Sequence, residues 1–329
     1  MVPTYEEELA TALAAVRSAM GVCQTVQAKL ITADTLTKKD KSPVTVADFA
    51  SQAVVCAALT QAFASDPIVG EEAAKDLTSD DQRTLREAVI AAARTALPGG
   101  TSDDEVMSYI DRGCAEGSTR RYWTLDPIDG TKGFLRGGQY AVALALIVDH
   151  EVVLGVLGCP NVETSGQRGT IFHAVHGRGA CMISAATVAK YIQVSRDANP
   201  ASARLCESVE SSHSDQSLSQ KIATSLGIES QPLRMDSQVK YGILARGEAS
   251  IYLRLPVRAD YREKVWDHAA GMIIVEEAGG TVTDITGKPL DFSHGRTLSA
   301  NRGIVASSGL IHDAVLRAVS DAGAFQLPA

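Results

Sequence analysis

The region that most restricts the fold runs from residue 122 to residue 183. It holds five apolar, strand-like runs, which are YWTLD, YAVALALIV, EVVLGVLG, TIFHAV and ACMI. Short turn signals such as Asp149-His150 and Gly177-Arg178-Gly179 separate them. Turns of this length join antiparallel neighbours, because a parallel connection needs a longer crossover. The sequence therefore predicts one largely antiparallel sheet, which the rest of the chain must cover.

The segment before this region predicts helices that could cover the sheet. Apolar residues recur at three- and four-residue steps, so one face of each helix would pack inward. The predicted helices cover residues 5–30, 46–63, 80–97 and 102–112, and the run PIVG at 67–70 predicts a short buried strand.

The polar run SRDANPASA, residues 195–203, predicts a domain boundary. After it, short strands around 204–209, 232–235, 250–255 and 303–308 alternate with helical stretches at 214–226, 238–246, 265–278 and 310–322. Such alternation favours an α/β arrangement. We therefore expect an α+β domain over residues 1–192 that carries the catalytic groups, and a smaller α/β domain over 193–329.

Composition narrows the class of function. The 329-residue chain has a formal net charge of −8, which argues against binding to a nucleic-acid polymer. Its six cysteines lack the paired spacing of zinc sites and are expected to be reduced thiols. The run YAVALALIV is too short to span a bilayer, and the acidic start shows no targeting pattern. We expect a cytoplasmic, monomeric enzyme or binding protein that does not contact a membrane.

Carboxylates fall at several of the predicted junctions between elements. Acidic side chains that meet at strand ends and helix starts would repel one another unless cations neutralise them. Ligation by oxygen without histidine or thiolate suits Mg²⁺. The residues are Asp48, which opens the second helix, Glu71 and Glu72 after a strand, Asp126 and Asp129 on either side of Pro127-Ile128, and Asp267 at a helix start.

Gly130 and Thr131 add an anion-binding feature to this set. At the start of a helix, their N–H groups and the positive end of the helix dipole would face an anion such as phosphate. Two divalent ions about 3.5–4 Å apart can stabilise both the attacking and the leaving oxygen of an in-line displacement. The set therefore predicts phosphomonoester hydrolysis, with Thr131 and a carboxylate taking the proton from the attacking water.

Each feature also has an ordinary structural interpretation. Asp48, Asp267 or Thr131 alone could be a helix cap. The acidic pair at 71–72 could lie in a solvated loop, and residues 126–130 could form a tight turn. Only the whole set favours a catalytic site.

Three of these motifs resemble a known family. GEE (70–72), WTLDPIDGT (123–131) and WDHAAG (266–271) are similar to the signature segments of the lithium-sensitive, magnesium-dependent phosphatases that include inositol monophosphatase. The resemblance implies a layered αβαβα sandwich and two to three bound Mg²⁺ ions. It implies that Asp48 and Thr131 activate the water and that the metal ligands are Glu71, Asp126, Ile128 through its carbonyl, Asp129 and Asp267.

Longer segments are similar to one branch of that family, the 3′(2′),5′-bisphosphate nucleotidases of fungi and plants. They include LDPIDGTKGFLRGGQYAVALALIVD, DSQVKYGILARG and YREKVWDHAAG, and the match runs from about Leu30 to Ser308. The KGFLRG extension and the DSQxKY segment separate this branch from inositol monophosphatases. The resemblance implies removal of the 3′-phosphate from adenosine 3′,5′-bisphosphate, activity on 3′-phosphoadenylyl sulfate, and inhibition by lithium.

The same resemblance implies a substrate-binding set. Lys240 and Arg254 are suitable cations for the 5′-phosphate. Lys240 alone could be a solvated helix residue and His213 a loop histidine, whereas a buried Arg254 within a strand needs an anion. Two rival functions remain open, an inositol phosphatase and a non-catalytic nucleotide or metal sensor on the same scaffold. The full set is Gly130, Thr131, Glu210, His213, Ser237, Lys240, Arg254 and Asp267.

Overall fold

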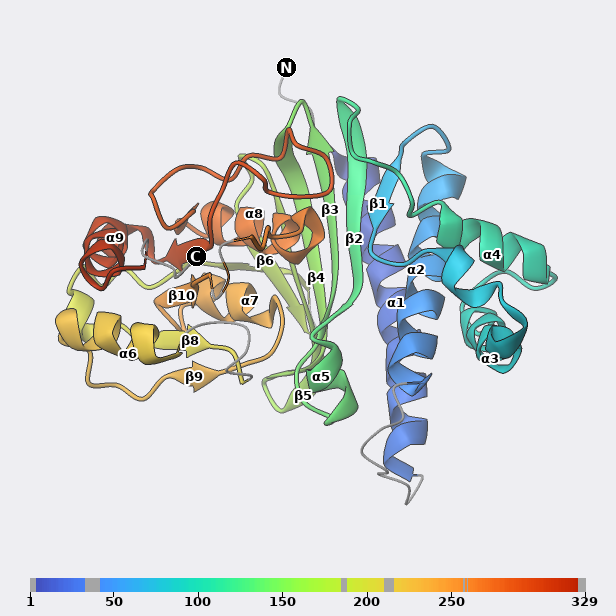
Figure 1. Ribbon diagram of the computed structural model, residues 1–329, viewed down its shortest axis with the longest axis horizontal. Helices are drawn as coiled ribbons and strands as arrows, with labels where there is room; N and C mark the ends of the chain where they lie inside the picture. The colour runs from blue at the N-terminus through green and yellow to red at the C-terminus, as the bar shows by residue number, and fades with distance from the viewer. Residues whose placement is uncertain are drawn as a thin grey trace.

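The protein is layered. The computed structural model describes residues 4–32, 42–184, 188–209, 216–256, 258 and 260–324. In this part of the chain, helices, a seven-stranded sheet, helices, a five-stranded sheet and helices follow one another (Figure 1). The predicted layered αβαβα sandwich is therefore confirmed.

The seven-stranded sheet keeps the order of the chain. β1 pairs with β2 in parallel, and all later neighbours are antiparallel, as the short turns predicted. The last strand, β7, was not predicted because it is only three residues long. The strands are β1 Ile68–Gly70, β2 Arg121–Asp129, β3 Ala141–Val148, β4 Glu151–Thr164, β5 Gln167–Val175, β6 Ala180–Ser184 and β7 Lys190–Ile192.

Within the described residues, helices α1 to α4 lie on one side of this sheet (Figure 1). They are α1 Glu6–Thr32, α2 Ser42–Ala62, α3 Arg83–Ala93 and α4 Asp103–Asp111, with 3-10 turns η1 Ala74–Leu77 and η2 Asp80–Gln82 between α2 and α3. The single helix expected over 80–97 is instead η2 followed by α3, which ends at Ala93, and residues 94–96 form a turn before Pro98.

Two of these helices are apolar over a long stretch. By length and composition alone, Glu6–Lys29 and Val44–Ala62 could cross a membrane. The second segment is 72% buried inside the protein, because α2 packs between α1, α3, α4 and the sheet. That burial is typical of a core helix, and the absence of membrane contact stays a prediction.

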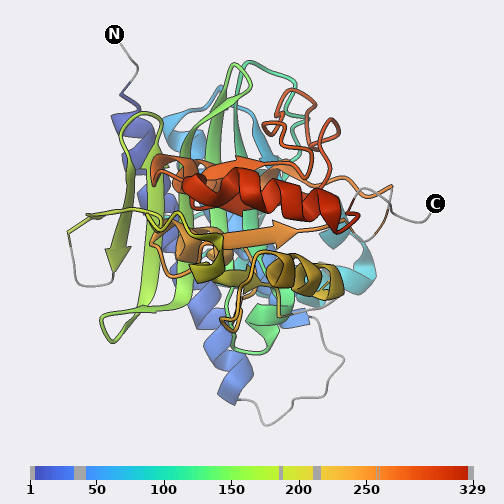
Figure 2. The same cartoon turned by 90° about the vertical axis from the view of Figure 1, so that its left-hand side faces the viewer.

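The other side of the large sheet carries a second helical layer and a second sheet. α7 Val239–Ala245 and α8 Ala269–Glu277 pack on both sheets. The second sheet has the order β11-β12-β10-β8-β9, and α6 Gln216–Ser225 and α9 His312–Asp321 cover its outer face (Figure 2). Its strands are β8 Leu205–Glu207, β9 Leu233–Arg234, β10 Ile251–Arg254, β11 Thr281–Thr283 and β12 Ile304–Ser307. Because α7 and α8 join both sheets, the predicted division at residue 192 stays a prediction.

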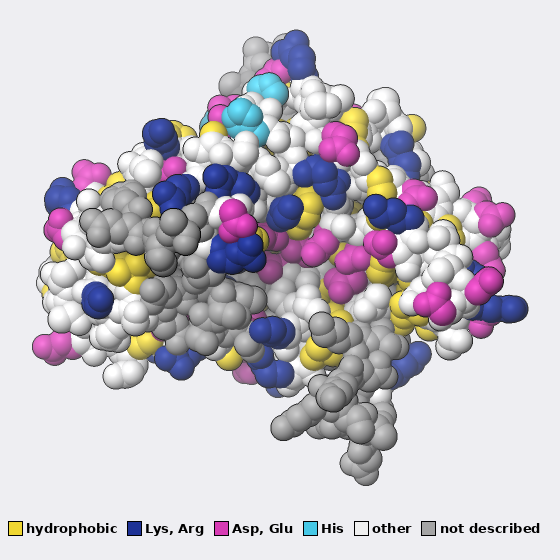
Figure 3. All heavy atoms as spheres, in the orientation of Figure 1, with side chains coloured by type: hydrophobic (Ala, Val, Ile, Leu, Met, Phe, Trp, Pro, Cys, Tyr) yellow, Lys and Arg dark blue, Asp and Glu magenta, His cyan; other side chains and the backbone are white. Residues whose placement is uncertain are grey.

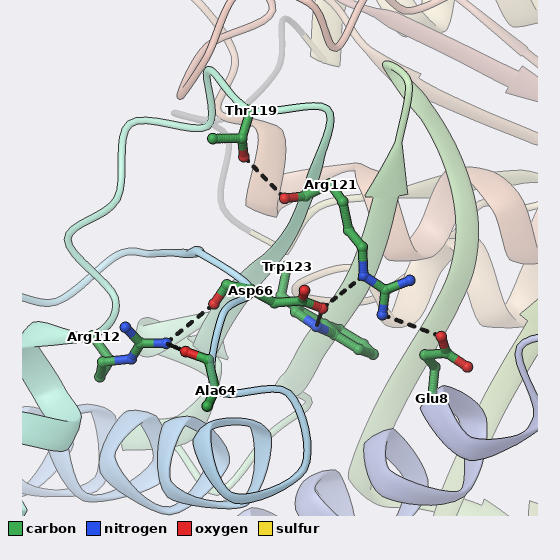
Figure 4. Close-up of polar contacts among 7 residues, drawn as sticks. All are labelled: Glu8, Ala64, Asp66, Arg112, Thr119, Arg121 and Trp123. Carbon is green, nitrogen blue, oxygen red and sulfur yellow. Dashed lines mark hydrogen bonds and ion pairs between the residues drawn. The ribbon is translucent and has the colours of Figure 1, made fainter.

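A buried polar cluster fixes the start of β2. Asp66 accepts hydrogen bonds through one oxygen from Arg121 Nε at 2.8 Å and Trp123 Nε1 at 3.1 Å. Arg121 also pairs with Glu8 of α1 at 3.1 Å, so three distant segments meet at this point (Figure 4). Because Trp123 lies three residues before Asp126, the cluster holds the strand that carries the predicted metal ligands Asp126 and Asp129.

Candidate active site

The end of β2 contains a β-bulge that explains the spacing of its two aspartates. Asp126 lies opposite Ala143 and Asp129 opposite Ala141, so one extra residue is inserted on β2. Residues three apart in a regular strand face opposite sides, and the extra residue brings both carboxylates to the same side. The N–H of Ile128, inside the bulge, donates to Asp126 Oδ1 at 3.1 Å. The alternative of a tight turn over 126–130 is therefore wrong.

The acidic pair after β1 is held by α2. Gln52 is fully buried, its Oε1 accepts from Glu72 N at 3.1 Å, and its Nε2 donates to Glu72 O at 2.7 Å. A Cβ on Gly70 would lie 2.5 Å from Gln52 Oε1, so the glycine permits this approach. The backbone at Glu72 is therefore held against α2, whereas Glu71 is exposed and Glu72 is half-buried.

Asp48 and Asp267 differ from their expected positions. α2 begins at Ser42, so Asp48 lies inside the helix rather than opening it, and its side chain is buried. Asp267 ends the 3-10 turn η5 Val265–Asp267, and His268 occupies the N-cap position of α8. The helix-cap alternative is wrong for both aspartates, because neither occupies a cap position.

Electrostatic interactions show that these carboxylates converge. Burial and the charges of Glu71, Asp129 and Asp267 raise the pKa of Asp126 well above its ordinary value. Part of Glu71 stays exposed, yet loss of hydration around its carboxyl group, with the charges of Glu72 and Asp129, raises its pKa to about 7. The same effects raise the pKa of Asp267 to about 7, mainly through burial and then through Asp129, against a lowering by Arg254.

Asp48 belongs to the same group. Its pKa is raised by burial and by the charges of Glu72 and Glu71. Acidic side chains also gather near the middle of the face shown in Figure 3, with Lys and Arg side chains beside them. Four segments far apart in the sequence therefore place their carboxylates within electrostatic range of one another.

This donor set fits a hard divalent cation. Carboxylate oxygens are acceptors only, and their mutual repulsion at neutral pH would be relieved by positive charge between them. The residues that would hold such ions are Glu71, Asp126, Asp129, Asp267 and the carbonyl of Ile128. The individual ligand roles stay predictions.

The DSQVKYG segment lies against the loop that follows Asp129. Gly130 has φ 92°, and a Cβ there would lie 2.8 Å from the Cβ of Ser237, which itself has φ 66°. Gln238 N donates to Asp129 Oδ2 at 2.5 Å. Lys240 is 3% exposed and its Nζ lies 5.1 Å from the ring centre of Tyr252, so the alternative of a solvated helix residue is wrong.

Arg254, half-buried at the end of β10, pairs with carboxylates of the protein. Its Nε lies 2.7 Å from Glu263 Oε2, and its Nη2 lies 3.7 Å from Asp267 Oδ2. The hydrogen bond from His268 and the charge of Arg254 outweigh the effect of burial and lower the pKa of Glu263 to about 2. The partners in this structure are thus protein carboxylates, and binding of a 5′-phosphate stays a prediction.

Thr131 is the exposed first residue of α5 Thr131–Leu135, and Gly130 is its N-cap, so Thr131 is not the cap. Its pairing with Asp48 stays a prediction. Glu210 and His213 lie outside the described residues.

Four residues of the site were not expected from the sequence, namely Gln238, Tyr241, Glu263 and His268. All four lie inside the segments DSQVKYG and YREKVWDHAAG, but spacing alone does not show that these segments meet.

Comparisons with known proteins show which family and which fold the chain is similar to. The model of the inositol monophosphatase family matches residues 4–324. A protein of Oryza sativa named 3′(2′),5′-bisphosphate nucleotidase is 44% identical over 97% of this chain and 95% of its own length. One of the same name from Schizosaccharomyces pombe is also 44% identical, over 96% of both chains.

Among solved structures, an inositol monophosphatase from Zymomonas mobilis has the same fold. It superposes with a TM-score of 0.64 at 20% identity and covers 97% of this chain and 99% of its own. The match of the family model over almost the whole chain, together with the two relatives, shows that the chain belongs to the inositol monophosphatase family.

Proposed function

We propose that the protein is a Mg²⁺-dependent phosphomonoesterase that converts adenosine 3′,5′-bisphosphate and water into AMP and phosphate. The convergence of Asp48, Glu71, Asp126, Asp129 and Asp267 carries this proposal, because such a set needs cations to be stable at neutral pH. The names of the relatives support the nucleotide as substrate. A non-catalytic sensor would not need the water-activating pair Asp48 and Thr131.

The roles of the residues follow from the chemistry of ester hydrolysis. Two to three Mg²⁺ ions held by the carboxylates would stabilise negative charge on the phosphoryl oxygens. Thr131 would take a proton from the attacking water and pass it toward Asp48, so that the new P–O bond forms as the bond to the ribose 3′ oxygen breaks. The leaving oxygen takes up a proton, and AMP and phosphate are released.

The second phosphate of the substrate would meet the cations of the C-terminal half. Arg254 and Lys240 are the proposed partners of the 5′-phosphate, with Ser237 beside the ribose. The same arrangement would accept 3′-phosphoadenylyl sulfate, because only the 5′ substituent differs. Lithium inhibition and a cytoplasmic location are further parts of this proposal.

The test is release of phosphate from adenosine 3′,5′-bisphosphate with Mg²⁺, with EDTA, and with Mg²⁺ plus lithium. Inositol 1,4-bisphosphate serves as the comparison substrate. We expect turnover only with Mg²⁺, and a larger kcat/KM for the nucleotide. A kcat/KM at least tenfold larger for the inositol ester would instead support an inositol phosphatase.

A further inference from the structure

A buried hydrogen-bonded network ends at Arg254. Tyr241 Oη lies 2.8 Å from His268 Nδ1, and His268 Nε2 lies 3.1 Å from Glu263 Oε2. That same Glu263 oxygen lies 2.7 Å from Arg254 Nε. We call Tyr241, His268 and Glu263 the buried network. Its members come from α7, the start of α8 and the segment before η5.

The chemistry of the groups fixes the direction of these bonds. A charged carboxylate can only accept, so His268 Nε2–H donates to Glu263. His268 Nδ1 is then free to accept the hydroxyl proton of Tyr241. His268 and Tyr241 are 0% exposed, so no solvent competes for either position. Both ring nitrogens of His268 are therefore occupied within the protein.

Gly271 allows this arrangement to form. A Cβ at residue 271 would lie 2.5 Å from Tyr241 Cγ, so only glycine lets the ring pack this closely on α8. The ring also meets Tyr252 edge-on, with centroids 5.0 Å apart. Tyr241 has little freedom to move away from His268.

The network determines how Arg254 is oriented. With Nε bonded to Glu263, the plane of the guanidinium is set, and Nη2 is directed to the Tyr261 hydroxyl at 3.3 Å and toward Asp267 at 3.7 Å. The Arg254 side chain keeps 22% of its surface exposed, whereas Glu263 keeps 7%. A dissolved anion can therefore reach the arginine but has little access to the glutamate behind it.

A metal site at Glu263, Asp267 and His268 fits these contacts less well. Their possible ligand atoms lie within 4.8 Å of one another. However, His268 has no free nitrogen, and the positive charge beside Glu263 is already that of Arg254. A cation would have to displace the arginine, which makes a positioning role the simpler assignment.

We propose that Tyr241, His268 and Glu263 are positioning residues that hold Arg254 in one orientation, so that it selects substrates with a second anionic group. This inference rests on the proposed function. The network would then act on discrimination between bisphosphate and monophosphate substrates rather than on cleavage of the ester.

The test compares kcat/KM for adenosine 3′,5′-bisphosphate and for adenosine 3′-monophosphate at saturating Mg²⁺. The ratio of the two values is the discrimination. We expect His268→Gln and Tyr241→Phe to lower it by roughly tenfold, mainly through a higher KM for the bisphosphate, because partners one step behind a ligand contribute about 10–100-fold. In an Arg254→Ala background, His268→Gln should change the ratio by less than about twofold, since both changes act through one group.

His312→Gln is the matched control. His312 is also buried, its Nδ1 lies 2.8 Å from the Ser307 hydroxyl and its Nε2 lies 3.0 Å from Thr283 Oγ1, at the start of α9. Its substitution should leave the discrimination unchanged. Tyr241→Phe keeps the ring and removes only the hydroxyl, so it gives a result even if His268→Gln does not fold.

Three outcomes would overturn the inference. The first is an equal loss of kcat/KM on both substrates in Tyr241→Phe and His268→Gln, which would mean a merely structural role. The second is a loss of discrimination in His312→Gln as large as in His268→Gln. The third is a wild type that hydrolyses neither nucleotide, which would overturn the proposed function as well.

Discussion

Substitution of Gly271 by alanine tests the packing between α7 and α8 on which the site depends. The added Cβ would overlap Tyr241 Cδ2 and would lie 2.5 Å from Cγ and 2.8 Å from Cε2, at least about 1 Å inside normal carbon contact distance. Alanine in place of glycine inside a helix normally stabilises a protein by about 1 kcal/mol. Overpacking of a core costs roughly 1–3 kcal/mol, and this ring is fully buried, so we use the upper value. The expected net loss in the free energy of unfolding is therefore about 2 kcal/mol.

Gly21→Ala provides the comparison. Gly21 lies in the middle of α1, and a Cβ there would have nothing within 4 Å. The same substitution should raise stability by up to about 1 kcal/mol at that position. Urea unfolding of both variants and the wild type measures these changes in stability. They appear as shifts in the midpoint urea concentration, while the dependence of the free energy of unfolding on urea concentration stays the same. If Gly271→Ala were as stable as the wild type, Tyr241 would not be confined by α8 as the structure indicates.

Three further predictions concern the carboxylates and their support. Asp126→Asn removes a buried charge, so it should stabilise the metal-free protein, which thermal unfolding in EDTA measures. It also removes a proposed metal ligand, so turnover measured by phosphate release should fall by more than about 100-fold. Folding raises the pKa of Glu71 and Asp267 to about 7, so in EDTA the free energy of unfolding should fall as pH rises from about 4 to about 7 and then level off. Mg²⁺ should then raise the melting temperature more at pH 8 than at pH 5. Arg296→Lys should lower the free energy of unfolding, measured in urea, by about 1–2 kcal/mol. The arginine donates to the carbonyls of Ala115 at 2.8 Å and Gly70 at 2.6 Å, and its guanidinium lies 4.7 Å from the Trp266 ring centre. Lysine would lose one of the two hydrogen bonds and the stacking.

The large sheet was predictable because its signal is local. The turn signals Asp149-His150 and Gly177-Arg178-Gly179 indicate antiparallel order for the strands on either side of them, and β2 to β6 appear where the apolar runs lie. The bulge was not predictable, because the extra residue between Asp126 and Asp129 is defined only by its pairing with β3. The position of Asp48 inside α2 was missed because the helix begins at Ser42, ahead of the first clearly apolar periodic residues.

The candidate site shows the same division between local and non-local information. The carboxylates could be found from their sequence motifs, and so could Lys240 and Arg254. The residues that support them could not, because Gln238 meets Asp129 across 109 positions of sequence and Tyr241 meets His268 across 27. Nothing in either motif indicates its partner. Only packing of α7 between the two sheets brings these segments into contact.

Most of the side chains that support the acidic segments bind main-chain atoms next to a carboxylate. They do not bind the carboxylate itself. Gln52 binds both main-chain groups of Glu72 at 3.1 and 2.7 Å, Arg296 the carbonyl of Gly70 at 2.6 Å, Ser51 that of Pro127 at 3.0 Å, and Gln238 Nε2 that of Trp266 at 2.8 Å. Contacts of this kind hold the acidic segments together without neutralising them. Burial, and then the repulsion that remains, raises the pKa of Asp126 and Glu71, and the oxygens of both stay available for cations from solution. A fold that paired each carboxylate with its own lysine would be more stable without metal ions. It would also bind metal ions less tightly, because each ion would have to displace a lysine.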